Sequence, residues 1–159
     1  MNTVNCGSSF PFQIKYATIA YSLYSTQINW RYNMTINKSA EDYLETILIL
    51  SKRLPVVRSV DIASEMNFKK SSISVAMKHL RENGCIIVNE SGFIYLTEKG
   101  HAIADMIYER HTFLAGWLMA LGIDETTATA DACRMEHVIS PKSFAAIKKY
   151  VTESGIKYP

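Results

Sequence analysis

Cys133, Glu136 and His137 bring three kinds of metal-binding side chain together within five residues. They lie in a segment with helical periodicity, where spacings of i, i+3 and i+4 place a thiolate, a carboxylate and an imidazole on one face. Such a donor set suits a divalent transition metal, and the soft sulfur argues against Mg²⁺ or Ca²⁺. These three residues therefore predict part of a metal site.

Three more donors lie on two other predicted helices. Asp42 and Glu45 stand at i, i+3 on an amphipathic helix expected over residues 40–52. His111 lies in the apolar row of a longer helix, which is expected over residues 98–121. The sequence therefore favours one metal site that is shared between helices.

Five of these six donors also have an ordinary structural explanation. Ser39 is the expected cap of the first helix, and Asp42, three residues later, could bond to the cap's own backbone amide. A lone cysteine on a helix is usually a small buried hydrophobe. His111 alone could be a satisfied core residue, and the pair Glu136–His137 could be solvated at a helix end. The joint arrangement of the donors, rather than any single one, predicts metal binding.

The composition is that of an ordinary globular protein, with 48% apolar and 20% charged residues among 159. This length allows one domain or two small ones. The cysteines (Cys6, Cys85 and Cys133) are odd in number and widely spaced, so we expect no disulfide framework and predict a reduced, cytoplasmic protein. No apolar run is long enough to span a bilayer, and none has the pattern of a secretory leader, so no membrane association is expected.

The composition changes sharply at Met34. Residues 1–33 contain no Asp or Glu and are rich in Tyr, Asn, Ser and Thr, whereas 15 basic and 15 acidic residues balance each other afterwards. We predict that residues 1–33 are a poorly ordered extension or the product of an upstream start codon, with a short aromatic arm as the alternative. Two domains are expected after it, over residues 34–99 and 100–159.

The first of these domains has the pattern of a winged helix. Two short helices are expected over residues 60–66 and 71–83, the second capped by Ser71. A tight turn joins them, which makes a helix-turn-helix. Two β-prone runs follow, over residues 85–88 and 93–96, with a hairpin pattern between them. The predicted fold class is therefore mainly α, with a winged helix-turn-helix domain followed by an α-helical domain.

The second helix of the helix-turn-helix is a candidate for reading DNA. Seven positions near its start are mostly short, polar or basic and suit entry into a major groove: Lys69, Lys70, Ser71, Ser72, Ser74, Val75 and Lys78. The amides of Ser71 and Ser72 can also contact a phosphate. Because the net charge is only +2, this local face must carry DNA binding, and a merely solvated basic helix is the alternative.

Three helices are expected after the hairpin. Thr97 opens the first, Asp124 or Thr126 opens the second, and Ser140–Pro141 opens the third. Large apolar side chains near the end of the first exceed what one small domain can readily bury: Phe113, Trp117, Leu118 and Leu121. We therefore predict a homodimer built mainly by this helical domain.

Five segments of the chain resemble the diphtheria toxin repressor family of metal-dependent transcriptional regulators. They are Ser39–Glu45, Val60–Ala63, Leu96–Gly100, Glu109–His111 and Ala132–Val138. The likeness runs in order from about Met34 to Val151. It implies a metal-activated repressor that binds double-stranded operator DNA, an inverted repeat, as a homodimer and controls genes for metal uptake or homeostasis. It also implies the short form of the family, without an SH3-like domain.

Carried over position by position, the family's metal ligands fall on the six donors Asp42, Glu45, His111, Cys133, Glu136 and His137. The pair Asp42 and Glu45 is similar to the manganese transport regulator branch, whereas Cys133 resembles the iron branch. The implied cofactor is Fe²⁺ or Mn²⁺, with Zn²⁺ or Co²⁺ able to bind in vitro. Two positions of the iron branch's ancillary site hold Ala115 and Thr129, so we do not expect that site as built there. A second ion on Glu45 and His111 remains open.

The resemblance also bears on DNA reading and on its control. Ser74 and Val75 occupy positions where the family reads bases, and Val75 stands in place of Gln or Lys, which favours contact with a thymine methyl group. Asp42 and Glu45 belong to the DNA-binding domain, whereas the other ligands belong to the helical domain. A metal that joins both sets would couple metal binding to operator binding.

Two other functions fit parts of the pattern. A zinc hydrolase could use Glu, His and Cys ligands with one open position. The chain has no HExxH motif and no Gly-rich phosphate loop, so we do not expect an enzyme. A winged-helix regulator that senses a small organic ligand, with a vestigial metal site, is the closer alternative.

Overall fold

The computed structural model describes residues 37–155, which all lie within one compact unit. The elements follow the chain in this order: α2 (Lys38–Arg53), α3 (Ser59–Glu65), α4 (Lys70–Glu82), β1 (Ile86–Val88), β2 (Ile94–Leu96), α5 (Glu98–Ala120), α6 (Glu125–Met135) and α7 (Pro141–Glu153). The expectation for residues 1–33 lies outside the described residues. None of the described helices combines the length and the apolar character needed to cross a membrane.

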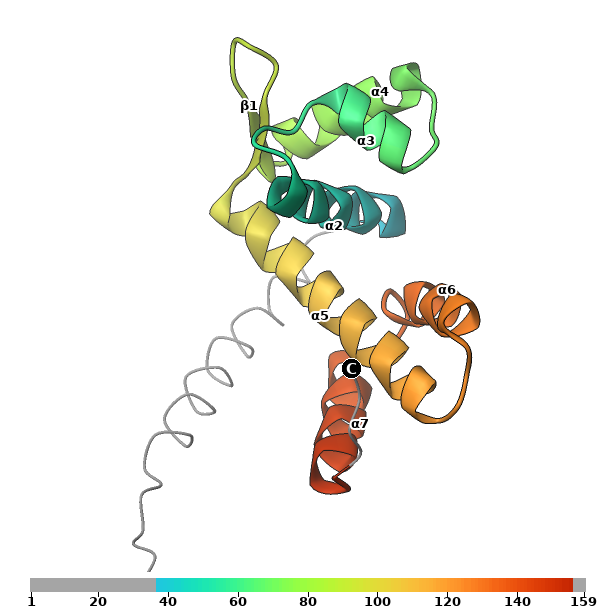
Figure 1. Cartoon of the computed structure of the whole chain (residues 1–159). Coiled ribbons are helices and arrows are strands. Elements are labelled where there is room, and N and C mark those ends of the chain that lie inside the picture. Colours follow the sequence, from blue (N-terminus) through green and yellow to red (C-terminus); the bar gives the residue numbers. More distant parts are fainter. Residues whose placement is uncertain (1–36, 156–159) are drawn as a thin grey trace, which may run out of the picture. The chain divides into compact units, whose positions relative to one another are not determined.

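The predicted winged helix is confirmed by α3, α4 and the β1–β2 hairpin, which we call the wing (Figure 1). Asn67 takes a left-handed φ of 53° in the turn between α3 and α4, a conformation that Asn tolerates better than most residues. β1 and β2 pair antiparallel with Ile86 opposite Leu96, and Val57 adds a single bridge to Ile94. α3 and α4 both pack on α2. The position of the candidate DNA-reading helix α4 therefore depends on that of α2.

Three helices begin earlier than predicted, α2, α3 and α4, and α3 does so by one residue, at Ser59. The Asn37 side chain accepts a hydrogen bond from the Ala40 amide at 3.0 Å, and so takes the capping role that was expected of Ser39. Both residue types can cap, and the helix extends to the earlier one. Asp42 then lies too deep in α2 to bond to the cap amide, so its alternative capping role is wrong. α4 likewise begins before Ser71, which lies inside the helix and is not its cap.

The long helix α5 links the two hydrophobic clusters of the described chain (Figure 1). Its first half packs with α2 and the winged helix, where Ala104 joins Leu44 in one cluster. Its second half packs with α6 and α7, where Leu114 joins Phe144 in the other. At its start, Gly100 approaches the wing so closely that an added Cβ would overlap the carbonyl oxygen of Cys85.

The apolar excess predicted at the end of α5 is smaller than expected. Phe113 and Leu118 are buried within the single chain, and Phe113 packs edge-on against Phe144 with ring centroids 5.4 Å apart. Trp117 is partly buried in the same cluster. Only Leu121, with 57% of its surface exposed, keeps the expected character. The expectation that one chain leaves this row uncovered was therefore wrong for Phe113 and Leu118, and Phe144 of α7 covers Phe113.

Candidate metal centre

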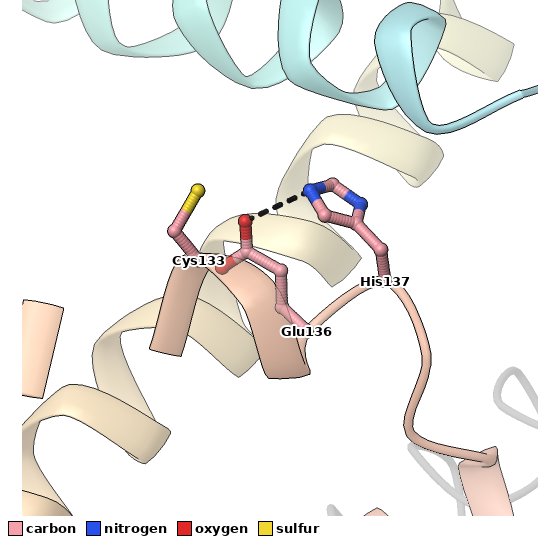
Figure 2. Close-up of side chains that lie close together, drawn as sticks. All are labelled: Cys133, Glu136 and His137. Carbon is pink, nitrogen blue, oxygen red and sulfur yellow. Dashed lines mark ion pairs between the residues drawn. The ribbon is translucent and has the colours of Figure 1, made fainter. Parts of the chain in front are cut away.

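The three donors at the end of α6 lie together, although not on one continuous helix (Figure 2). α6 ends at Met135, Glu136 is its C-cap residue, and His137 lies beyond it. The prediction of a single helical face is therefore wrong at its last position. Glu136 keeps helical dihedral angles (φ −57°, ψ −33°). The backbone therefore places His137 close to the position that it would have in a continued helix. Ligand atoms of Cys133, Glu136 and His137 consequently lie within 4.8 Å of one another.

Glu136 belongs to two groups of donors at once. Its carboxylate is fully buried, with Oε2 lying 2.8 Å from His111 Nδ1 and Oε1 lying 3.1 Å from His137 Nε2. The first contact adds α5 to the centre, and Glu45 joins it from α2. Ligand atoms of Glu45, His111 and Glu136 also lie within 4.8 Å of one another. The structure thus brings the predicted donors of three helices to one carboxylate.

Asp42 completes the cluster from α2, with Oδ1 lying 2.7 Å from His137 Nε2. Among the described residues, His137 Nε2 and Glu136 Oε1 are buried and lack a well-aligned hydrogen bond, as does Glu45 Oε1. Buried polar atoms normally have partners. Atoms that bind one ion at about 2.1 Å and at right angles lie roughly 3 Å apart, which is close to the distances of Asp42 Oδ1 (2.7 Å) and Glu136 Oε1 (3.1 Å) from His137 Nε2. The donors therefore fit a divalent transition metal that would replace the missing hydrogen bonds.

The electrostatics of the group favour a cation in the same place. Burial, and then the charge of Glu136, raise the pKa of the Glu45 carboxyl from 4.5 to about 7. Burial and the carboxylates of Glu136 and Asp42 also raise the pKa of the Cys133 thiol. The hydrogen bond with Glu136 is the main cause that raises the pKa of His111. Each shift reflects negative charge crowded away from water, and a divalent cation at this place would reverse that effect.

Two residues at the centre were missed in the sequence. Glu41 is buried and places Oε2 2.8 Å from His137 Nδ1. Arg110 is completely buried and donates hydrogen bonds to the backbone carbonyls of Glu136 (3.0 Å) and Ile139 (3.3 Å). Helical spacing could have found both, because Glu41 precedes Leu44 by three positions and Arg110 precedes Leu114 by four. A charged residue on a buried face is unusual unless it has a partner.

The seven candidate DNA-contacting positions are all exposed on α4 or just before it: Lys69, Lys70, Ser71, Ser72, Ser74, Val75 and Lys78. The opposite face of α4 is buried through Ile73, Met77 and Leu80. The Ser74 hydroxyl donates to the carbonyl of Lys70 at 3.0 Å. Val75 is 56% exposed on the same face as these polar and basic side chains. The face is free to meet a groove.

Two family descriptions match nearly the whole described chain. Residues 35–92 match the iron dependent repressor, N-terminal DNA binding domain. Residues 97–154 match the iron dependent repressor, metal binding and dimerisation domain. The first match ends in the wing and the second begins at Thr97, the residue that caps α5.

Individual relatives give the same picture. An uncharacterised HTH-type transcriptional regulator of Methanocaldococcus jannaschii is 31% identical over 118 residues, which cover 73% of this chain and 94% of the relative. The transcriptional regulator MntR of Escherichia coli O6:H1 is 28% identical over 74% of this chain and 76% of its own length. Among solved structures, the manganese regulator SloR is 28% identical with a TM-score of 0.64 over 75% of this chain. The match spans 55% of the SloR chain, about half its length.

Proposed function

This chain belongs to the iron-dependent repressor family, and we propose that it is a metal-dependent transcriptional repressor which binds operator DNA as a homodimer when it carries Fe²⁺ or Mn²⁺. The operator is expected to be an inverted repeat, because a two-fold dimer presents two equal reading helices. Its site of action is the chromosome, hence the cytoplasm. Because the metal itself is the signal, we expect the repressor to control genes for metal uptake or homeostasis.

One observation carries the proposal: donors from both family domains converge on His137 and Glu136. Asp42 Oδ1, from α2 in the DNA-binding domain, lies 2.7 Å from His137 Nε2 in the metal-binding domain. Glu136 Oε1 lies 3.1 Å from the same nitrogen. A site that needs side chains from both domains is sensitive to how the domains are arranged.

The route from metal to DNA runs through α2. When bound, a divalent ion supplies the positive charge that this acidic group of side chains lacks. Asp42 then stays beside His137, and α2 is held against the end of α6. Because α4 packs on α2, the reading helix is held as well. In a homodimer this arrangement sets the distance between two reading helices, so metal and operator binding are positively linked.

The donor set supports Fe²⁺ or Mn²⁺ without separating them. Asp42 and Glu45 are oxygen donors, which suit Mn²⁺, whereas a Cys133 thiolate favours softer ions. The second group, Glu45 with His111 and Glu136, supports a second ion that shares Glu136. Ala115 offers no ligand, so such an ion would differ from the ancillary ion of the iron branch.

A DNA-binding assay with controlled metal tests the proposal. The upstream region of the protein's own gene is titrated with protein in the presence of Mn²⁺, Fe²⁺ (kept anaerobic), Zn²⁺ or a chelator. We expect tight, sequence-selective binding with Mn²⁺ or Fe²⁺ and its loss with the chelator. Tight operator binding that ignores the chelator would instead favour a sensor of an organic ligand. The repressor function would be overturned if the metal-loaded protein bound neither this region nor any sequence selected from a random DNA library.

A further inference from the structure

Glu41 contacts the ring nitrogen of His137 that faces away from the other metal donors. Its Oε2 lies 2.8 Å from Nδ1, and the two residues are 96 positions apart in the sequence. We propose that Glu41 is a positioning residue, which holds the His137 proton on Nδ1 and so presents an unprotonated Nε2 to the metal. This inference rests on the metal-dependent function proposed above and adds a residue that the comparison with the family did not supply.

The argument begins with the two nitrogens of the ring. Nε2 lies 2.7 Å from Asp42 Oδ1 and 3.1 Å from Glu136 Oε1, so it is the nitrogen at the metal donors. A histidine binds a metal only through an unprotonated nitrogen, and the hydrogen bond of the other nitrogen decides which one that is. A carboxylate cannot donate when ionised, so Glu41 can only accept the Nδ1 proton. The Glu41 contact therefore selects the tautomer that the metal needs.

Burial strengthens this selection. Only 6% of the surface of Glu41 and 3% of the His137 side chain are exposed. In such surroundings water cannot replace the carboxylate as a partner of Nδ1, and a hydrogen bond to a charged group is stronger than it is in water. Carboxylates in this relation to a metal-binding histidine fix the ring and raise its basicity.

The contact also concerns the DNA-binding domain. Glu41 and Asp42 are neighbours on α2, and they approach opposite nitrogens of the same ring. α2 thus holds the ring on both sides. Losing Glu41 should therefore weaken metal binding and also raise the metal concentration needed for operator binding.

Three variants test the proposal with Zn²⁺, which is diamagnetic, as the probe. Glu41→Gln keeps an acceptor and removes the charge, whereas Glu41→Ala removes both. Glu98→Gln is the matched control, because Glu98 is an exposed glutamate in the first turn of another helix. Zn²⁺ affinity is measured by competition with a chelating dye. The tautomer of His137 is read from long-range ¹H–¹⁵N NMR spectra of the Zn²⁺-loaded protein, and thermal unfolding without metal reports the fold.

We expect Zn²⁺ affinity to fall about 10- to 100-fold in Glu41→Ala, the range found for such outer partners, and less in Glu41→Gln. In the Zn²⁺-loaded parent and in Glu98→Gln, the Nδ1 proton of His137 should exchange slowly with water and be observed, whereas in Glu41→Ala it should exchange too fast to be observed. Unchanged affinity together with a slowly exchanging Nδ1 proton in Glu41→Ala would overturn the proposal. So would an equal loss of affinity in Glu98→Gln. If the parent protein itself bound no metal, the proposed function would fail first, and the two failures are thereby distinguished.

Discussion

Glu136 Oε2 and His111 Nδ1 lie 2.8 Å apart and join the end of α6 to the middle of α5. Since Oε1 of the same carboxylate lies 3.1 Å from His137 Nε2, one side chain contacts both histidines of the centre. Glu136 is completely buried, so its charge has to be balanced by these neighbours or by a metal. This relationship makes Glu136 the residue on which both possible ions depend.

His137→Ala should remove a ligand and weaken Mn²⁺ binding by more than about 100-fold, beyond the range for outer partners. Metal-stimulated operator binding should be lost with it, while the helical circular dichroism spectrum stays unchanged.

Lys78→Ala should have the opposite effect, since Lys78 is exposed on α4. It should weaken DNA binding, lower the salt dependence by roughly one counterion, and leave Mn²⁺ affinity unchanged. A His137→Ala protein that still responds to metal would show that the centre is wrongly assigned.

Cys133→Glu should change the metal preference. The thiol group lies within 4.8 Å of the Glu136 and His137 donors, and a carboxylate there replaces a soft ligand with a hard one. Affinity should shift toward Mn²⁺ relative to Zn²⁺ or Co²⁺. The Co²⁺-loaded parent should also show a sulfur-to-metal absorption band that Cys133→Ala lacks. If both variants match the parent in affinity and spectrum, Cys133 is not a ligand.

The metal-free protein should lose stability as the pH rises from about 4.5 to 7. The pKa of Glu45 is raised to about 7 in the fold, so the folded state keeps a proton that the unfolded chain releases. The raised pKa of His111 acts in the same direction. The free energy of unfolding therefore falls with pH across this window, and Mn²⁺ affinity rises as the proton is displaced. Urea unfolding at several pH values checks this.

Glu45→Gln provides the control for that pH dependence. The amide cannot titrate, so the slope of stability against pH should become shallower between pH 4.5 and 7, while Glu65→Gln, an exposed change on α3, should leave the slope alone. A slope that does not respond to Glu45→Gln would place the titrating group elsewhere.

Val75 should read a thymine methyl group in the operator. Its side chain is 56% exposed on the face of α4 that is free to meet DNA. Replacing the contacted thymine with uracil removes one methyl group, which is worth about 0.8 kcal/mol or roughly fourfold in affinity. Competition binding with singly substituted operators measures this. Val75→Ala should be less sensitive to the same replacement, and equal affinity for every uracil-substituted operator would exclude the contact.

Arg110→Met should destabilise the fold and loosen the centre. The guanidinium is completely buried and donates to the carbonyls of Glu136 and Ile139. Met keeps much of the volume but leaves these buried carbonyls without their donor, which costs on the order of 2–4 kcal/mol. Chemical denaturation of the metal-free protein measures the loss. Arg134→Met, an exposed change on α6, should cost less than about 0.5 kcal/mol.

Local signals in the sequence predicted much of this fold. Thr97 caps α5 and Ser140 caps α7 as expected, because each is a capping residue directly before an apolar period. For α6 the sequence left Asp124 and Thr126 open, and the structure selects Asp124. The expectation that Ser39 caps α2 was wrong, since Asn37, two residues earlier, is also a capping residue type and takes that role in the folded helix. Periodicity alone likewise could not tell that α6 stops at Met135.

The sequence predicted the six metal donors, but it did not predict the contacts between them and the surrounding side chains. The six donors carried a family pattern along the chain, and the structure gathers them. Glu41 carried no such pattern, and its partner His137 lies far away in the sequence. A contact of that kind depends on how α2 crosses the end of α6, which no local signal encodes. The burial of Phe113 depends in the same way on α7, which supplies Phe144.

The close approach of Gly100 to the wing has a mechanical consequence. No side chain separates α5 from the carbonyl of Cys85, so α5 rests directly on the residue that precedes β1. At 1.5 Å per residue, His111 lies about 16 Å further along the same helix. If α5 tilted by 5° at Gly100, His111 would move by roughly 1.4 Å, whereas metal–ligand distances vary by only about 0.2 Å. A bound ion would therefore oppose any change in the angle between α5 and the wing.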